Sequence, residues 1–245
     1  MTSALIILAA FGTAFLSGIF GMAGGLLLMG ILAFLLPVSA AFVTHGILQL
    51  VANGWRAVVH RQHVVWPIMR TYALGVFAAA AVVAVIGFAP SRPLLFLLLG
   101  LVPLVVWLPR RWIAFDASRP AHAFLAGFTV SGLNLTAGVA GPMMDVFFVR
   151  TALTRHQIFA TKAAGQVFSH VGKIAVFGTP LLIAGGDGMP PWWVFAVAIP
   201  LSMLGTMFGG LVLDRISDGN FRRYTAWIVT GIGALYIVKA GLEWM

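Results

Sequence analysis

Polar and basic side chains recur at helical spacing in two apolar stretches, FVTHGILQLVANGWR (42–56) and FATKAAGQVFSHVGK (159–173). The residues concerned are His45, Gln49, Asn53 and Arg56 in the first stretch and Lys162, Gln166, His170 and Lys173 in the second. Spacings of four, four and three residues place each set on one helix face. Most of these groups are hydrogen-bond donors, which suit an anion that offers several acceptor oxygens.

A second interpretation of the two polar faces is a buried structural network. In that case Arg56 and Lys173 extend along their segments, so that their charges reach the membrane surface. Lys162 fits this interpretation less well, because it lies about seven residues inside its segment, where an unpaired ammonium group is costly. We therefore expect these residues to contribute to a binding site.

Asp145 is the one acidic residue within the first six apolar segments, apart from Asp116 in a loop. We expect it to neutralise Lys162 or Arg150 in a salt bridge. Alternatively, it shares a proton with a histidine, in which case the candidates for proton coupling are His45, Asp145 and His170.

The composition is that of a membrane protein. The 245 residues are 61% hydrophobic and only 9% charged, with a mean hydropathy of +1.02, whereas soluble domains carry about 25% charged residues. The net charge of +9 fits basic cytoplasmic loops next to anionic lipid better than nucleic-acid binding, because no soluble domain is present to carry a basic surface. The sequence predicts an all-α polytopic protein of the cell membrane, with the lipid bilayer and no nucleic acid among its partners.

Apolar runs between polar loops define eight predicted segments: 4–36, 40–59, 66–88, 93–109, 121–149, 156–178, 191–213 and 221–243. The first and the fifth are the longest, and glycines interrupt both, in SGIFGMAGG (17–25) and SGLNLTAGVAGP (131–142). A helix of about 30 residues would be ~45 Å long, which exceeds a hydrocarbon core of ~30 Å. Each of these two segments is therefore either a long tilted helix or a hairpin.

The distribution of Lys and Arg favours the hairpins. If all eight segments cross once, eight basic residues face one side and six the other, which is no bias. If the two glycine-broken segments each enter and return, eleven residues share one face and three lie opposite. The eleven are Arg56, Arg61, Arg70, Arg110, Arg111, Arg119, Arg150, Arg155, Arg215, Arg222 and Arg223, opposite Arg92, Lys173 and Lys239. We expect the first face to be cytoplasmic and both termini to lie outside.

This topology inverts the second half of the chain relative to the first. The predicted division is a first transmembrane repeat (1–112), a cytoplasmic linker (113–120) and a second transmembrane repeat (121–245), each repeat a glycine-broken hairpin followed by three transmembrane helices. Weak identities recur in the same order: Ser17-Gly18 with Ser131-Gly132, Leu74-Gly75 with Leu204-Gly205, and Gly100 with Gly231. Interrupted helices at matching positions of inverted repeats indicate a transporter binding site.

The glycine breaks themselves are candidate binding elements. Irregular backbone at membrane depth persists only where it is buried in protein or lines a wet cavity, and its free N–H groups attract anions. The candidate residues there are Gly24 and Gly25 in the first break and Asn134, Thr136 and Gly138 in the second. Alternatively, the small residues serve close helix packing.

Signatures of enzymes, metal sites and cofactors are lacking. The sequence has no HExxH, no GxSxG, no P-loop lysine and no cysteine. His60 and His63 are spaced for a metal, but loop histidines beside arginine are more often solvated. We expect no catalysis, no metal and no cofactor.

Taken together, the broken hairpins and the polar segments that follow them resemble the TauE/SafE family of sulfite-exporter-like membrane proteins. The pattern covers essentially the whole chain, although the first break lacks the proline that the second keeps in Gly141-Pro142. The resemblance implies a secondary transporter that moves sulfite, sulfoacetate or a related organosulfonate by alternating access. The alternatives are an anion channel and a non-transporting accessory protein or enzyme. The sequence also leaves a homodimer open.

Overall fold

The computed structural model describes residues 1–245 except 21, 110–113, 214 and 216–217, and gives only the backbone for a few residues beside these gaps (22, 213 and 218–222). The described residues are helical, without strands. The α-helices are α1 (Thr2–Phe20), α2 (Met22–Leu35), α3 (Val38–Val59), α4 (Trp66–Ile86), α5 (Arg92–Leu101), α6 (Pro120–Thr136), α7 (Gly141–Phe148), α8 (Arg155–Ile183), α9 (Trp192–Leu213) and α10 (Asp218–Trp244). Two 3₁₀-helices, η1 (Arg61–His63) and η2 (Val102–Trp107), complete the order.

Local sequence explains several helix boundaries. Thr154 caps α8 in a reciprocal arrangement with Gln157, and the hydroxyl of Ser91 accepts a hydrogen bond from the backbone of α5. Gly87 ends α4 with a φ of 65°, a left-handed conformation that favours glycine. These signals confine the helices to lengths suited to a bilayer. Five of them are long and apolar enough to cross one, and α2 and the α5–η2 stretch provide shorter apolar helices.

Both glycine-broken segments fold back on themselves. In the first, Gly24 of α2 lies directly against the backbone of Thr13 and Ser17 in α1. In the second, the N–H of Ala117, just before α6, donates to the carbonyl of Phe147 near the end of α7, at 2.9 Å. The segment predicted at 121–149 therefore ends beside the point where it begins, although α7 has only eight residues.

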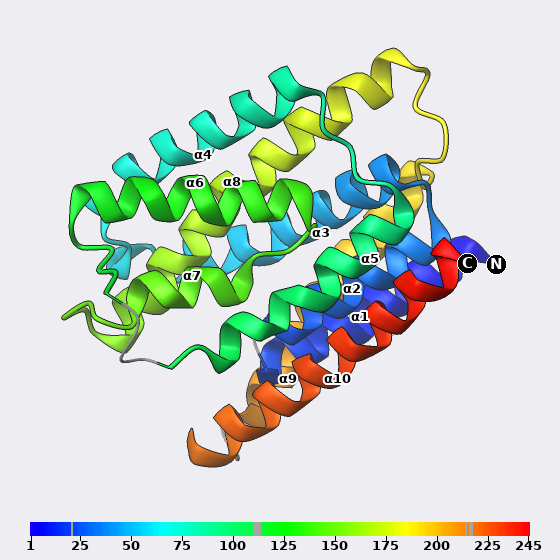
Figure 1. The fold of residues 1–245 in the computed structure, drawn as a ribbon. Helices are drawn as coiled ribbons and strands as arrows, with labels where there is room; N and C mark the ends of the chain where they lie inside the picture. Colours follow the sequence, from blue (N-terminus) through cyan, green and yellow to red (C-terminus); the bar gives the residue numbers. More distant parts are fainter. Residues whose placement is uncertain (21, 110–113, 214, 216–217) are drawn as a thin grey trace.

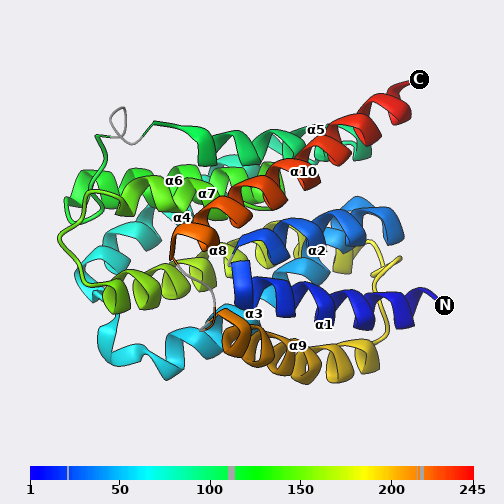
Figure 2. The ribbon, with the colours of Figure 1, turned by 90° about the horizontal axis from the view of Figure 1, so that it is seen from below.

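The loops gather at two opposite ends of the molecule (Figures 1 and 2). One end holds the connections 60–65 and 149–154 with residues 108–109, 114–119 and 215, and the other holds both termini with the connections 36–37, 87–91 and 184–191. At the second end, Arg92 Nη2 donates to the carbonyl of Leu36 at 3.2 Å, and Gly188 contacts Pro37. Arg92 thus lies at the end opposite the loops that carry Arg61, Arg119 and Arg155, whereas Lys173, which the charge count placed on the same side as Arg92, is buried within α8. Arg110 and Arg111, together with the side chain of Arg222, lie outside the described residues.

The helices of the two halves pack in matching pairs. Helix α1 packs on α9 and α4 packs on α6, while α3 contacts α8 and α5 contacts α10. The counterparts in the two halves are α1 and α6, α3 and α8, α4 and α9, and α5 and α10. If each helix is replaced by its counterpart, the same four packing pairs result. In the α5–α10 pair, Gly100 packs against Gly233.

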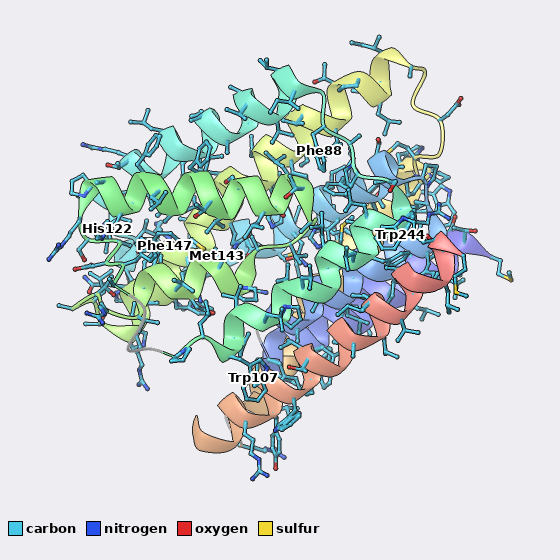
Figure 3. All side chains as sticks on the ribbon, in the orientation of Figure 1. Phe88, Trp107, His122, Met143, Phe147 and Trp244 are labelled. Atoms are coloured by element: carbon cyan, nitrogen blue, oxygen red, sulfur yellow. The ribbon has the colours of Figure 1, made fainter. Side chains whose placement is uncertain are left out.

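Two predicted segments differ from the structure in detail. The segment 93–109 is α-helical only to Leu101 and continues as η2, because Pro103 lacks the N–H that would extend the α-helical hydrogen bonds. Helix α8 runs to Ile183, five residues past its predicted end, with Pro180 in its last turn. Tryptophan side chains are exposed near the helix ends, as a belt at a membrane interface requires. Figure 3 shows Trp107 and Trp244 lying towards different ends of the molecule.

Candidate functional site

A cavity of about 1150 Å³ lies between the broken hairpins and helices α3, α8 and α9. Its lining includes the exposed side chains of Trp55, Arg155 and Phe159, which belong to the arginine-rich end of the molecule. At the other extreme its lining is buried, with His45 and His170 only 1% and 3% exposed. The cavity therefore extends from the arginine-rich end to a buried floor.

His45 connects this floor to the first glycine break. Its Nε2 atom lies 3.1 Å from the carbonyl oxygen of Gly25. A carbonyl oxygen only accepts hydrogen bonds, so Nε2 carries the hydrogen. The Nδ1 atom of the neutral ring is then an acceptor.

Lys173 supplies the donor to that acceptor. Its side chain is completely buried, with Nζ 3.2 Å from Nδ1 of His45 and 5.2 Å from the ring centroid of Phe42. The same Nζ donates to the carbonyl of Gly138, a residue with a φ of 79° in the second break. A continuous chain of hydrogen bonds thus runs from Gly25 through His45 and Lys173 to Gly138 and joins the two breaks.

Three buried polar side chains on the cavity wall have atoms without a hydrogen-bond partner among the described residues. They are Asn134, through both atoms of its amide, His170, through Nδ1, and Thr225 of α10, through Oγ1. The ring of His170 lies 5.7 Å from that of His45. Leaving such a buried group unsatisfied costs about 1–3 kcal/mol, so these positions are suited to a polar ligand.

The remaining polar residues of α3 form a connected row along the cavity. Asn53 Nδ2 donates to the backbone carbonyl of Gln49 at 2.9 Å, and Arg56 Nη1 donates to Asn53 Oδ1 at 3.4 Å. A long contact of 3.5 Å also joins Arg56 Nη2 to the hydroxyl of Ser17 in the first break. These contacts hold the Arg56 guanidinium at the cavity wall.

On α8, Lys162 forms an ion pair with Asp145 of α7, which confirms the predicted salt bridge and selects Lys162 over Arg150. Both side chains are partly exposed, at 29% and 40%, and both line the cavity. Gln166 lies one helical turn further along α8, with its amide 3.5 Å from the sulfur of Met144. The ion pair places a cation and an anion on the same wall.

The loop histidines His60 and His63 lie next to other aromatic rings. In the described part of the chain, no three side chains among His, Asp and Glu gather closely enough to hold a metal ion. His63 instead lies beside His156, with the ring centroids 5.4 Å apart, and His60 packs edge-on against Phe159.

The arrangement of broken hairpins around a polar cavity can be compared with known proteins. The family model of the sulfite exporter TauE/SafE matches residues 6–236 of the chain. The chain belongs to the TauE/SafE family. No curated protein and no solved structure matches it significantly. The TauE/SafE family consists of membrane transporters of the sulfite-exporter type, and the apolar helices of this chain agree with a multi-pass membrane protein.

Most of the residues predicted for the site line the cavity of this TauE/SafE chain. They are Gly25, His45, Gln49, Asn53, Arg56, Asn134, Asp145, Lys162, Gln166 and His170. Four predicted substrate contacts do not line it: Gly24, Thr136, Gly138 and Lys173. Gly24 packs on α1 and the hydroxyl of Thr136 donates to the carbonyl of Gly132, while Gly138 and Lys173 bind each other behind the floor.

The structure corrects one interpretation of Lys173. As an alternative to binding, the sequence allowed its ammonium to reach the membrane surface, but the side chain is fully buried between α3 and the second break. The continuation of α8 to Ile183 places Lys173 in the middle of the helix rather than near its end.

Sequence reasoning missed the wall contributed by α9. Residues Pro200, Met203, Thr206 and Gly210 face the cavity. Their sequence signal is weak, because apolar and small residues on a membrane helix do not distinguish a cavity wall from a packed surface. Arg155 also lines the cavity, and the sequence identified it only as a basic loop residue.

Proposed function

We propose that this chain is a secondary transporter that moves a small sulfur-containing anion, such as sulfite, sulfoacetate or a related organosulfonate, across the cell membrane. The observation that carries the proposal is the cavity floor, where Asn134 and His170 have unpartnered polar atoms in front of the buried amine of Lys173. This combination offers hydrogen-bond donors, and an amine that can take up a positive charge, at the end of an open cavity.

The chemistry of the cavity walls favours an anion. Arg56, Arg155 and Lys162 supply positive charge along the path from the arginine-rich end, opposed by Asp145 alone among the lining acids. A sulfonate or sulfite group presents three oxygens, which can accept from amide, imidazole and basic donors together. Such an anion can accept hydrogen bonds from Asn134 Nδ2 and from an N–H at Nδ1 of His170, which have no partner among the described residues.

The proposed architecture consists of two inverted repeats, residues 1–112 and 121–245, joined by a cytoplasmic linker at 113–120, of which residue 113 lies outside the described residues. The matching helix pairs support this division, as does the return of each broken segment to its own starting end. We assign the arginine-rich end to the cytoplasm by the positive-inside rule, which places both termini outside. The cavity then opens inward, and exchanging the conformations of the two repeats gives alternating access.

The alternatives make different physical demands. An anion channel needs a continuous pore, whereas this cavity ends at a floor of buried residues. An enzyme needs reactive groups on a substrate, and the floor residues are donors suited to binding. An accessory protein without transport needs no such floor. That the protein forms a homodimer stays a prediction.

Counterflow in proteoliposomes tests the proposed function. Purified protein is reconstituted with unlabelled sulfoacetate inside, and the uptake of labelled sulfoacetate is followed with sulfite, taurine and carboxylates as competitors. A transporter gives saturable uptake that requires internal substrate, while a channel gives uptake without it and conductance in a planar bilayer. The absence of exchange for every anion in the panel would refute the proposal.

A further inference from the structure

Lys173 occupies a position in which its positive charge has no counter-ion. The contacts of Nζ are the carbonyl of Gly138, Nδ1 of His45 and the face of Phe42. Over the described residues the ion pairs are Lys162–Asp145 and Lys239–Glu243, so no carboxylate lies within ion-pair distance of this amine. Burying a charge without a partner is expensive. The described residues therefore supply no negative charge to compensate a protonated Lys173.

His45 and Lys173 form a pair that can hold one proton charge between them. Nε2 of His45 donates to Gly25, which leaves Nδ1 facing the amine at 3.2 Å. Either the amine carries the extra proton and donates to the ring, or the ring carries it and donates to the neutral amine. If both residues were protonated, the N–H groups of two cations would point at each other across 3.2 Å. The pair therefore has a neutral state and a singly positive state.

The groups around the pair add no negative charge. On α8, His170 lies one turn before Lys173, and its ring is 5.7 Å from that of His45. On α4, which packs on α8, Tyr72 is held by a hydrogen bond of 3.0 Å to Ser169. The neighbouring part of α6 contributes the uncharged Asn134. The one acid of α3, α7 and η1 is Asp145, which is paired with Lys162. An anion at the floor is therefore the nearest source of compensating charge.

We propose that the His45–Lys173 pair takes up one proton with each anion and is the coupling site of the transporter. This inference rests on the proposed transport function. A proton from water in the cavity joins the neutral pair as the anion binds to Asn134 and His170, and it leaves to water on the other side when the anion leaves. By linkage, the proton tightens anion binding as much as the anion tightens proton binding. Anion and proton then cross in the same direction, and the empty carrier returns with a neutral pair.

Titration calorimetry measures this coupling directly. Sulfoacetate is the probe, because it remains ionised near neutral pH, whereas sulfite itself gains and loses a proton there. Titrating the purified protein in buffers of different ionisation enthalpy, over a series of pH values, gives the number of protons taken up per anion. We expect uptake to rise towards one proton per anion in the part of the series where the empty pair is neutral.

Two substitutions and one control assign the proton to the pair. Lys173→Met should abolish proton uptake and weaken sulfoacetate binding about tenfold or more, within the range of typical coupling energies. Lys173→Arg, which carries a permanent charge, should bind sulfoacetate without proton uptake. Lys239→Met removes a lysine paired with Glu243 at the other end of the molecule and should leave proton uptake unchanged.

The outcomes separate the two proposals. If sulfoacetate binds to the wild type without proton uptake at any pH, the coupling site is wrong and the transport function stands. If a folded Lys173 variant keeps the wild-type uptake, the assignment to this pair is wrong. If neither sulfoacetate nor any other sulfonate binds, both proposals fall. The titrations of the wild type over the series of pH values test the proton coupling even if a variant does not fold.

Discussion

Gly75 and Gly205 make the same contact in the two halves of the chain. A β-carbon on Gly75 would lie 2.1 Å from the carbonyl oxygen of Phe124 in α6, and one on Gly205 would lie 2.6 Å from that of Phe11 in α1. Both glycines also face the amide nitrogen four residues further along the same partner helix, at 2.7 and 3.1 Å. The first helix of each hairpin therefore packs on the fourth helix of the other half, α1 on α9 and α6 on α4, through backbone contact that any side chain would prevent.

Enlarging one of these glycines should destabilise the protein. Gly75→Ala forces α4 away from α6, and overpacking of this kind costs about 1–3 kcal/mol. We expect its melting temperature in detergent to fall by several degrees. Gly231→Ala is the matched control on α10, because a β-carbon there meets nothing within 4 Å. Equal melting temperatures for the two variants would contradict the packing.

The proposed orientation can be tested with single cysteines, because the chain contains none. Gln62→Cys lies in η1 at the arginine-rich end, and Asp187→Cys lies in the connection 184–191 at the opposite end. An impermeant thiol reagent should label position 187 in intact cells and position 62 only in inverted vesicles. Labelling of both positions from one side would contradict the hairpin topology. The reverse pattern would show that the protein is inserted in the opposite orientation.

The charge count that favoured two hairpins is a simple sequence signal. The positive-inside rule depends only on counting Lys and Arg between apolar segments, and hairpins at 4–36 and 121–149 make that count asymmetric. The matching of Leu74-Gly75 with Leu204-Gly205 also agrees with the packing, since close helix contact requires the absence of a side chain at that position. Both features are local in the sequence.

The partners of the polar residues could not be predicted in the same way. Helical spacing assigned His45 and Lys173 to the polar faces of their helices, but it did not predict that these two side chains meet. Which residues meet depends on how α3 and α8 cross, and periodicity does not contain that angle. The carbonyl of Gly138 is available to Lys173 only because the second break bends the chain there.

Asn134 should contribute to anion binding and not to stability. Asn134→Leu has a similar volume and removes two buried polar atoms that have no partner in the part of the chain that the structure describes. We expect sulfoacetate affinity to fall about tenfold, since a hydrogen bond to a charged group contributes ~1.5–3 kcal/mol, while the melting temperature stays the same or rises.

Thr44→Val is the matched control for Asn134→Leu. The hydroxyl of Thr44 is likewise buried and unpartnered, but it does not line the cavity. Its loss should leave sulfoacetate affinity unchanged. An Asn134→Leu variant that melts several degrees lower and binds as the wild type does would show that the amide serves the fold.

The ion pair between Asp145 and Lys162 should weaken anion binding by occupying the lysine. Asp145→Asn removes the acid on the cavity wall and releases the ammonium, so we expect sulfoacetate affinity to rise about two- to fivefold, as is usual for partly exposed charges. The increase should shrink as salt concentration rises, because salt screens exposed charges.

Lys162→Met should lower affinity, and adding Asp145→Asn to it should restore nothing. Glu243→Gln breaks the ion pair with Lys239 far from the cavity and should change neither affinity nor its salt dependence. If Asp145→Asn instead lowers affinity as much as Lys162→Met does, the carboxylate holds α7 against α8, and the anion needs that geometry more than it needs a released lysine.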